Sequence, residues 1–468
     1  MTAPQIVWLR RDLRLADQAA FHHAAARGPV LPVFVLDDVR PGDRRPGGAH
    51  RWWLHHSLAA LADDLRARGV PLVLRQGDSV AQLLDISRAS GAGGIHAIRH
   101  YEPWWRKAEG DLKDGLPAGV TLHLHDGNYL LPPGCLRTGG GGLYKVYSPF
   151  ARAALAVLPP AEPLPAPALQ SVADPPRGEH LDDLTLLPTR PDWAGGLRAC
   201  WNGAVGEAAA VRALERFSAR LAAYAEARNQ PAADGSSRLS PHLHWGEISP
   251  ARVWHALAEQ GSAGWDKFRG ELLWRDFTQN LIVQFPRYGE ANIRRDFDRF
   301  PWRDPTADDE AAAGLAAWQQ GRTGYPIVDA GMRQLWTIGW MHNRVRMLTA
   351  SFLVKHLLID WRHGERWFWD TLVDADYANN THNWQWVAGT GVDAQQFTRI
   401  MAPLAQSEKF DAAQYIRRWV PELADLDDAA IHDPGDAVRP RTYPPRRVEH
   451  GEARERALAA YRRMKADA

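Results

Sequence analysis

The chain has 468 residues, of which 45% are hydrophobic, with 56 Lys and Arg against 55 Asp and Glu. This composition is typical of a globular protein and excludes intrinsic disorder. A net charge of +1 excludes a polybasic protein that holds nucleic acid by bulk charge, so any DNA binding must come from a local patch. The two cysteines, Cys135 and Cys200, cannot build a disulfide framework, and they fit a reduced cytosolic setting. The longest apolar stretch, 347–361, is broken by Lys355 and His356, so we expect no membrane span.

The first 130 residues alternate between short apolar runs and helical stretches such as Ala49–Arg68 and Ser79–Ala89. This alternation predicts a Rossmann-like parallel α/β domain. The turn after the first run has no glycine, so the GxGxxG dinucleotide fingerprint is absent there. The five predicted strands are Ile6–Leu9, Val30–Leu36, Pro71–Leu74, Ile95–Ile98 and Val120–Leu124.

Residues 132–195 contain a glycine run and many prolines, which is typical of a long loop that wraps a surface. From about residue 196 the apolar residues follow helical spacing, and no convincing strand intervenes. We therefore expect an α/β domain over 1–131, a linker over 132–195 and an all-helical domain over 196–468. The predicted helices are Glu207–Arg228, Pro250–Gln260, Phe268–Gln284, Tyr325–Thr337, Asn343–Leu358 and Glu365–Leu372.

Three segments gather residues that can carry chemistry. Serines and an arginine in 234–249 precede a helix-like run, a pattern that suits a phosphate and equally a simple helix cap. Glu271, Trp274 and Arg275 share one helix face, which is also the pattern of a surface ion pair beside a core tryptophan. In 371–394, carboxylates and amides precede two indoles, but the order of an EF-hand is missing, so we expect no metal.

Tryptophan is the residue in unusual excess, with 21 copies. Most of them fit a core rich in large aromatic side chains. Some could instead carry electrons or stack on bases, and composition leaves both interpretations open.

Long blocks of the sequence resemble the photolyase/cryptochrome family. The opening IVWLRRDLRLAD is similar to that family's first strand and turn. GRTGYPIVDAGMRQLWTIGWMHNRVRM, ASFLVKHLLIDWRHGERWFWDTLVDAD and NWQWVAGTGVDA are similar to its helical domain. The likeness covers nearly the full chain. RQLWTIGW and FWDTLVDAD look closer to plant cryptochromes and class III photolyases than to the commonest bacterial photolyases.

The resemblance implies a bent FAD in the helical domain. Arg346 and Asp374 would pair beside the flavin, and Asp376 would lie near its N3/O2 edge or the adenine. Asn380 would face flavin N5, where an amide can accept from or donate to that nitrogen. The implied FAD-binding residues are Tyr224, Ser236, Ser237, Arg238, Leu239, Ser240, Arg275, Arg346, Asp374, Asp376 and Asn380.

The resemblance also implies a cavity for a pyrimidine dimer flipped out of DNA. Trp274 and Trp386 would wall it, because stacking contributes about 1–3 kcal/mol per base. Glu271 would stabilise the radical anion of the dimer. Photolyases of the (6-4) type carry two histidines where this chain has Asn343 and Met347, so we expect the cyclobutane dimer as substrate. The implied substrate residues are Glu271, Trp274, Asn343, Arg344, Met347 and Trp386.

The family's electron relay implies two well-matched tryptophans, Trp384 next to the flavin and Trp361 in the middle. Trp302 would be the outer member, although its spacing departs from the common pattern. Trp336 and Trp369 offer a second route.

The resemblance also implies a second, light-harvesting chromophore, the antenna. It is expected where a Tyr-Glu pair is followed by Trp104 and Trp105. Two indoles could stack a pterin, or they could pack against the linker. We expect methenyltetrahydrofolate, with a deazaflavin or no antenna as alternatives.

The function implied is that of a deoxyribodipyrimidine photo-lyase, a cytosolic monomer that repairs UV-damaged DNA with light and reduced FAD. The alternative is a cryptochrome, a blue-light receptor without repair. Asn380 in place of an acid and the complete substrate set favour repair. A passive single-strand DNA binder is disfavoured by the near-zero net charge.

Overall fold

The computed structural model describes residues 2–466, which form two compact units. Unit 1 comprises the chain up to Tyr144, together with Ser148–Leu221 and Ser237–Pro286. Unit 2 comprises Lys145–Tyr147, Ala222–Ser236 and the chain from Arg287 onward. The domain ranges expected from the sequence, 1–131, 132–195 and 196–468, stay a prediction.

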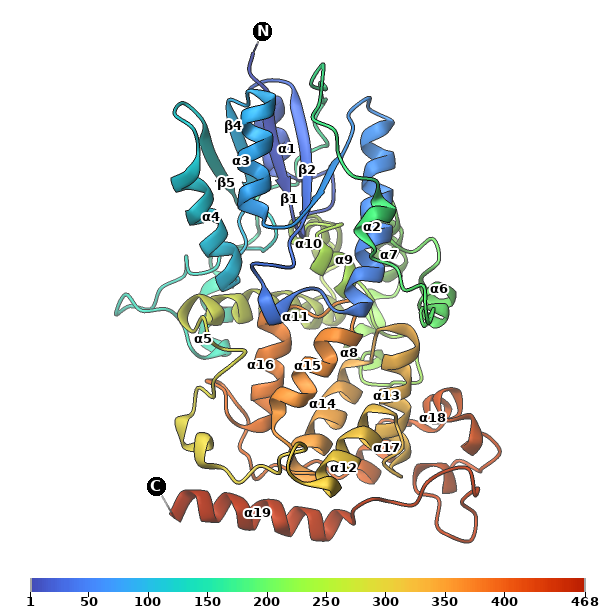
Figure 1. Ribbon diagram of the computed structural model, residues 1–468. Coiled ribbons are helices and arrows are strands. Elements are labelled where there is room, and N and C mark those ends of the chain that lie inside the picture. The colour runs from blue at the N-terminus through green and yellow to red at the C-terminus, as the bar shows by residue number, and fades with distance from the viewer. Residues whose placement is uncertain (1, 467–468) are drawn as a thin grey trace. The chain divides into compact units, whose positions relative to one another are not determined.

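A five-stranded parallel sheet in the order β3-β2-β1-β4-β5 lies in unit 1 (Figure 1). In its register, Ile6 of β1 pairs with Leu31 of β2 and with Ile95 of β4. The three central strands are buried along their whole length, as expected of a parallel sheet covered on both faces. The predicted α/β domain is therefore confirmed. The strands are β1 (Gln5–Leu9), β2 (Val30–Leu36), β3 (Val73–Gln76), β4 (Gly94–Ile98) and β5 (Thr121–His125).

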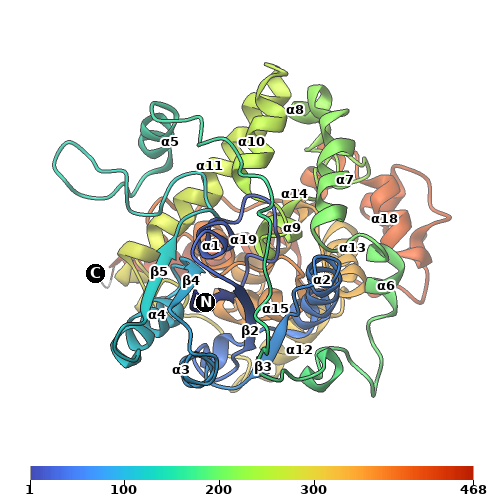
Figure 2. The same cartoon turned by 90° about the horizontal axis from the view of Figure 1, so that it is seen from above.

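Helices cover both faces of this sheet. Helix α1 packs on one face, whereas α3 and α4 pack on the other (Figure 2). Trp8 and Ile95 on the second face contact Leu83 of α3 and Leu112 of α4 in one apolar cluster. Asp78 starts α3 by accepting a hydrogen bond from Ala81 N at 2.9 Å. The helices are α1 (Ala19–Ala25), α2 (Gly48–Arg66), α3 (Ser79–Ser90) and α4 (Pro103–Gly115).

The proline-rich segment 132–195 lies against the edge of the sheet. Ser171 forms an isolated bridge with Val30, and Glu179 N donates to Leu74 O at 2.9 Å. The segment is not all loop, because it contains α5 (Tyr147–Leu155) and a short 3-10 turn. Helix α5 buries Phe150 against Phe277, with ring centroids 5.3 Å apart.

Further helices follow in unit 1. The predicted helix Glu207–Arg228 is interrupted, because α7 ends at Ser218 and a 3-10 turn follows at Leu221–Ala223. Apolar spacing continues through the break, so periodicity alone could not reveal it. The helices are α6 (Gly195–Trp201), α7 (Glu207–Ser218), α9 (Ser240–Trp245), α10 (Pro250–Ala258) and α11 (Ala263–Gln284).

Unit 2 is helical around one large apolar cluster that includes Trp318, Phe352 and Trp384. The predicted helix Asn343–Leu358 is α14 only as far as Ser351, and a π-helical turn continues it over Phe352–His356. Within residues 2–466 no strand follows β5, which agrees with the predicted all-helical second part. The helices are α8 (Tyr224–Ala227), α12 (Asp309–Gln319), α13 (Pro326–Ile338), α14 (Asn343–Ser351), α15 (Trp361–Thr371), α16 (Tyr377–Ala388), α17 (Pro403–Lys409), α18 (Ala413–Trp419) and α19 (His450–Ala466).

Candidate active site

An ion pair between a half-buried arginine and a buried aspartate joins α14 to the segment that precedes α16. Arg346 Nη2 donates to Asp374 Oδ2 at 2.9 Å, and Arg346 Nε donates to Met341 O at 2.8 Å. The other carboxylate oxygen, Asp374 Oδ1, is buried without a hydrogen-bond partner among residues 2–466. A buried acceptor left without a donor costs about 1–3 kcal/mol. This oxygen therefore fits a donor that is not part of the protein, such as the N–H group of the expected flavin.

The side-chain amide of Asn380 in α16 is held by Glu365 in α15. Asn380 Nδ2 donates to Glu365 O at 3.0 Å and to Glu365 Oε1 at 2.9 Å. These two acceptors take both amide hydrogens and fix the orientation of the amide. What Asn380 still offers is Oδ1, which can only accept a hydrogen bond.

Sequence reasoning missed Glu365, although the sequence carries a signal for it. Glu365 shares the buried stripe of α15 with Trp361 and Phe368, and its exposed fraction is 0%. A carboxylate on the apolar face of a helix needs a buried partner, and here that partner is Asn380.

Asp376 is the N-cap of α16. Its Oδ1 accepts from Asn379 N at 2.9 Å and from Asn379 Nδ2 at 2.8 Å. This capping alone explains an acid at the position. The expected role of Asp376 beside the flavin or adenine stays a prediction.

Two buried histidines in unit 2 add no positive charge at neutral pH. Burial lowers the pKa of His342, the N-cap of α14, to about 4, and it does the same for His382 in α16. His342 Nδ1 accepts from Arg344 N at 3.3 Å, which requires the unprotonated ring nitrogen. The positive charge of this region therefore comes from its arginines and lysines.

Four of the five expected relay residues belong to one apolar cluster or pack against it. Trp361 and Trp384 are buried members of it, and Trp302 and Trp369 pack against it. Trp361 Nε1 donates to Asn292 Oδ1 at 2.9 Å, and the Trp384 ring lies 5.0 Å from the ring of Phe368.

The two alternatives for the outer relay position differ in exposure. Trp302 is half-buried, and its ring lies 4.3 Å from that of Phe300. Trp336 is 59% exposed and stacks on Trp367 at 5.7 Å. Both candidate routes thus have an indole near the surface, and the choice between Trp302 and Trp336 stays a prediction.

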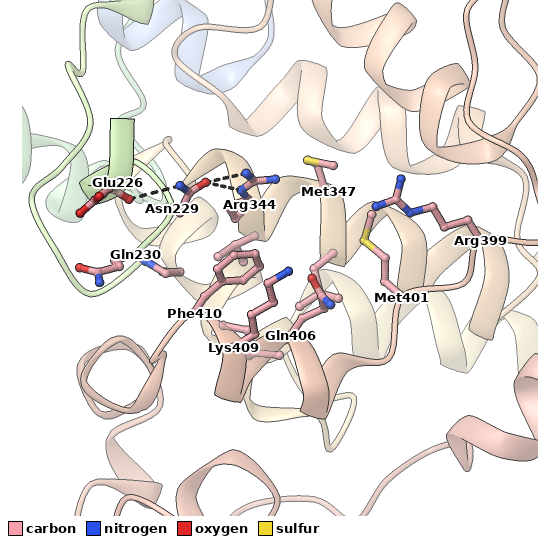
Figure 3. A pocket seen from close by; sticks show the side chains of 14 residues that line it. Glu226, Asn229, Gln230, Arg344, Met347, Arg399, Met401, Gln406, Lys409 and Phe410 are labelled. Carbon is pink, nitrogen blue, oxygen red and sulfur yellow. Dashed lines mark hydrogen bonds between the residues drawn. The ribbon is translucent and has the colours of Figure 1, made fainter. Parts of the chain in front are cut away.

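A pocket of about 490 Å³ opens in unit 2 next to α14 (Figure 3). Of the predicted substrate residues, Arg344 and Met347 line it. Arg344 Nε and Nη2 donate to Asn229 Oδ1 at 3.0 and 2.5 Å, so Asn229 fixes this guanidinium. Asn343 is exposed at the first turn of α14, and Trp386 is half-buried in α16.

Sequence reasoning missed most of the lining of this pocket. Arg399 and Lys409 add two cations to Arg344, and Phe410 also lines the pocket. The Phe410 ring centroid is 5.4 Å from the Arg344 guanidinium and 5.6 Å from the Lys409 ammonium. These residues lie far from α14 in the sequence, where no local spacing could connect them.

Helix α11 of unit 1 carries Glu271, Trp274 and Arg275, all half-buried. Arg275 Nη1 donates to Asn128 O at 2.5 Å and Arg275 Nη2 to Leu243 O at 3.0 Å. Arg275 therefore links the backbone of two other segments of unit 1 to α11. Its expected role toward FAD stays a prediction, as do the substrate roles of Glu271 and Trp274.

The residues expected to hold the diphosphate fall in both units. In unit 2, Tyr224 is buried in α8 with the Arg228 guanidinium 5.6 Å from its ring, and Ser236 is half-buried. In unit 1, Ser237 Oγ accepts from Leu239 N at 3.3 Å.

Arg238 and Ser240 follow Ser237 in the unit 1 part of the expected diphosphate site. Arg238 has a φ of +53°, a rare conformation for a residue with a side chain, and exposed Ser240 begins α9. Their shared role stays a prediction.

The expected antenna residues lie at the start of α4 in unit 1. Trp105 packs edge-on against Trp8 with ring centroids 6.1 Å apart. The Arg10 guanidinium lies 4.1 Å from the Trp8 ring and 5.5 Å from the Trp105 ring. Trp104 is half-buried. Trp105 thus has a packing partner in the sheet core, which explains its presence without a pterin.

Comparison with known proteins shows the family. Residues 5–168 match a model described as DNA photolyase, and residues 268–463 match the FAD binding domain of DNA photolyase. The chain is 47% identical to a deoxyribodipyrimidine photo-lyase of Agrobacterium fabrum, over 99% of this chain and 98% of that protein. The chain belongs to the DNA photolyase family.

Members of this family with solved structures include a bacterial class III photolyase from Agrobacterium tumefaciens. Its structure matches this photolyase-family chain with a TM-score of 0.93 at 46% identity, covering 100% of this chain and 98% of that one. Cryptochrome-1 of Arabidopsis thaliana is 34% identical over 92% of this chain and 65% of its own length. The fold and the FAD-binding domain are thus those of a photolyase, with cryptochromes among the relatives.

Residues 2–466 of this photolyase-family chain contain neither a helix suited to span a membrane nor a cluster of metal-ligating side chains. None of the described helices combines the length and the apolar character needed to cross a bilayer. Between residues 2 and 466, no three His, Cys, Asp or Glu side chains are grouped so that they could hold a metal ion.

Proposed function

We propose that this chain is a light-driven deoxyribodipyrimidine photo-lyase that splits cyclobutane pyrimidine dimers in DNA. The observation that carries the proposal is the buried Asn380, whose amide is fixed by Glu365 so that only its carbonyl oxygen remains available. The Arg346–Asp374 pair of the same unit, with its unpartnered Asp374 Oδ1, supplies a further acceptor. The photo-lyase name of the Agrobacterium relative agrees with this function.

Bound FAD would supply one electron to the dimer after absorbing blue or near-UV light and recover it once two carbon–carbon bonds have broken. No net oxidation results, so no cosubstrate is needed. Asn380 Oδ1 would accept a hydrogen bond from N5–H of the reduced ring. Asp374 Oδ1 would accept a hydrogen bond from another N–H group of the flavin. The charge of Arg346 would favour the anionic reduced form of the ring.

The diphosphate and adenine side of FAD would be held by residues carried over from the family. Arg275 and Asp376 would contribute, in addition to their contacts within the protein. The remaining residues proposed here are Tyr224, Ser236, Ser237, Arg238, Leu239 and Ser240.

The cationic pocket of unit 2 would bind the DNA backbone beside the lesion. Arg344, Arg399 and Lys409 together give a local patch, which the net charge of +1 requires. Asn343 and Met347 would contact the dimer itself.

Two indoles and one carboxylate would complete the substrate cavity. Trp274 and Trp386 would stack on the dimer, and Glu271 would hydrogen-bond its pyrimidine edges. Each stack is worth about 1–3 kcal/mol, so Trp386→Ala should weaken binding to damaged DNA accordingly.

Electrons for reduction of oxidised FAD would pass through Trp384 and Trp361. Trp302 would be the exit to the surface, with Trp336 and Trp369 as the alternative route. Trp384 and Trp361 are buried in one apolar cluster, and Trp302 and Trp369 pack against it, which supports the relay.

For the antenna we propose methenyltetrahydrofolate near Trp104 and Trp105, with a deazaflavin or no antenna as alternatives. We also propose that the protein acts as a cytosolic monomer without a metal. The family domains would occupy 1–131 and 196–468, joined by the linker 132–195.

The second candidate is a cryptochrome-type photoreceptor without repair. The likeness to Arabidopsis cryptochrome-1 favours it. The two functions differ in whether light changes the DNA.

A repair assay separates the two candidates. The protein, reduced and illuminated with DNA that contains cyclobutane dimers, should restore thymine absorbance near 260 nm. A parallel substrate with (6-4) products should show no recovery. Recovery with (6-4) products alone would contradict the substrate assignment that rests on Asn343 and Met347.

A further inference from the structure

Lys355 places an ammonium group in the interior of unit 2. It lies in the π-helical turn Phe352–His356, and its exposed fraction is 0%. Among residues 2–466 no carboxylate forms an ion pair with it, and its Nζ makes one hydrogen bond, to Arg399 O at 2.8 Å. Burying an unpaired charge is unfavourable, so packing alone does not explain a lysine here. π-Helical turns are often found at functional sites.

The acceptor of this hydrogen bond belongs to the candidate pocket. Arg399 is exposed, lines the pocket, and lies in an irregular loop between α16 and α17. Phe397 anchors the same loop, because its buried ring packs against Phe297 and Phe300. The Lys355 ammonium lies 5.4 Å from the centroid of the Phe397 ring. Lys355 therefore holds the backbone of this loop at Arg399, the residue whose side chain lines the pocket.

None of the charged groups described around Lys355 raises the pKa of its ammonium group. Arg399 repels it, and burial together with this repulsion lowers the pKa of Lys355 to about 7. The next residue, His356, bonds to His450 of α19 at 2.9 Å, and Arg456 of α19 donates to His356 O at 2.6 Å. Burial lowers the pKa of His356 to about 3, so this ring is neutral.

We infer that Lys355 is a positioning residue for DNA binding, which holds the Arg399 peptide so that the Arg399 guanidinium meets a phosphate. The inference rests on the proposed function, because it takes DNA as the ligand of this pocket. A charged donor makes a hydrogen bond about twice as strong as a neutral one. The loop is thus held most firmly while Lys355 is protonated, and DNA affinity falls as pH rises through 7.

The test is a double-mutant cycle on DNA affinity with the FAD-loaded protein and a dimer-containing duplex in the dark. Arg399→Ala removes the phosphate contact and should lower the salt slope of binding by about one unit. Lys355→Met, which keeps the length and apolar stem, should weaken binding about three- to tenfold through the same contact. In the Arg399→Ala background, Lys355→Met should add little. Lys465→Met is the matched control, since it removes an exposed lysine paired with Asp296, and it should leave affinity unchanged.

Two readouts separate positioning from a purely structural role. Wild-type affinity should fall between pH 6 and pH 8.5, and this pH dependence should disappear in Lys355→Met. The thermal midpoint of Lys355→Met at pH 7 should be no lower than that of the wild type, because a costly buried charge has gone. Lys355→Gln, which retains a neutral donor, serves as a second variant. Its DNA affinity should lie between those of the wild type and Lys355→Met.

Three results would overturn the inference. Additive effects of the two substitutions would mean that Lys355 does not act through Arg399. Unchanged affinity in Lys355→Met, with weakened binding in Arg399→Ala, would refute the role of Lys355 while the DNA pocket stands. Unchanged affinity in Arg399→Ala would refute both this inference and the assignment of the pocket, and the repair assay would then decide separately whether the protein is a photolyase.

Discussion

Gly364 in α15 leaves the space that the ring of Trp384 fills. A Cβ atom on Gly364 would lie 2.1 Å from Trp384 Cη2 and 2.6 Å from Leu353 Cδ2. Gly364→Ala should therefore displace the indole and lower stability by about 1–3 kcal/mol. It should also slow photoreduction of oxidised FAD, if Trp384 is the inner relay residue.

The matched control for this substitution is Gly110→Ala in α4, where nothing lies within 4 Å of the added Cβ. That variant should gain about 0.5–1 kcal/mol of helix stability. Thermal unfolding of both variants gives the comparison. Equal midpoints would show that Trp384 tolerates a Cβ at Gly364.

The relay itself is tested by replacing its indoles with phenylalanine, which has a similar shape but is much harder to oxidise. Trp384→Phe should block photoreduction of oxidised FAD, whereas repair by protein reduced chemically beforehand should continue. Trp302→Phe should slow photoreduction severely if Trp302 is the exit, and little if Trp336 and Trp369 provide one. Transient absorption of the tryptophanyl radical measures each case. Rapid photoreduction in Trp384→Phe would refute the relay.

At the scale of elements, a buried acid of α11 binds the segment that follows β5. Asp276 Oδ2 accepts from Leu131 N at 3.0 Å, and burial raises the pKa of this carboxyl to about 7, against an ordinary value of 3.8. Between pH 4 and pH 7 the folded chain keeps a proton here that the unfolded chain has lost. Stability therefore falls as pH rises through this window, by up to about 1.4 kcal/mol per pH unit.

Asp276→Asn removes this titration and keeps an acceptor for the Leu131 N–H group. Its thermal midpoint should match that of the wild type at pH 3.5 and exceed it increasingly from there up to pH 8. A difference that stays constant between these two pH values would contradict the raised pKa.

Most elements could be predicted because their signals are local. Each of the five strands overlaps a range predicted from an apolar run in the sequence. The breaks at Ser218 and Ser351 could not be predicted, because apolar spacing continues across both. The π-helical turn after Ser351 is set by packing against α19 and the loop that holds Phe397.

At the scale of the whole molecule, a net charge of +1 confines the attraction for DNA to a few cations. The affinity should fall with salt at a slope that matches only a few phosphates. Arg344→Ala should reduce that slope by about one unit. Arg287→Ala, an exposed arginine paired with Glu290 outside the pocket, is the control and should leave the slope unchanged. Equal slopes for the two variants would place Arg344 away from the DNA backbone.

Part of the site could be predicted by resemblance of motifs. The resemblance implies that Arg346 pairs with Asp374, and the two side chains form an ion pair. Their role beside a flavin stays a prediction. The resemblance did not reveal Arg399 or Lys409, because these two residues line the same pocket as Arg344 only once distant segments of the chain have folded together. Glu365 was missed although its place on the apolar face of α15 indicates a buried partner.

The most direct test of the proposed repair counts dimers split per bound FAD. The wild-type protein, reduced beforehand and free of added cosubstrate, is mixed with an excess of dimer-containing oligothymidine and illuminated, and absorbance near 260 nm is followed. A photo-lyase should restore thymines far in excess of its FAD, only in light, because the electron returns after each cycle. Reduced FAD and bound DNA with no recovery in light would contradict the account and leave the photoreceptor as the function.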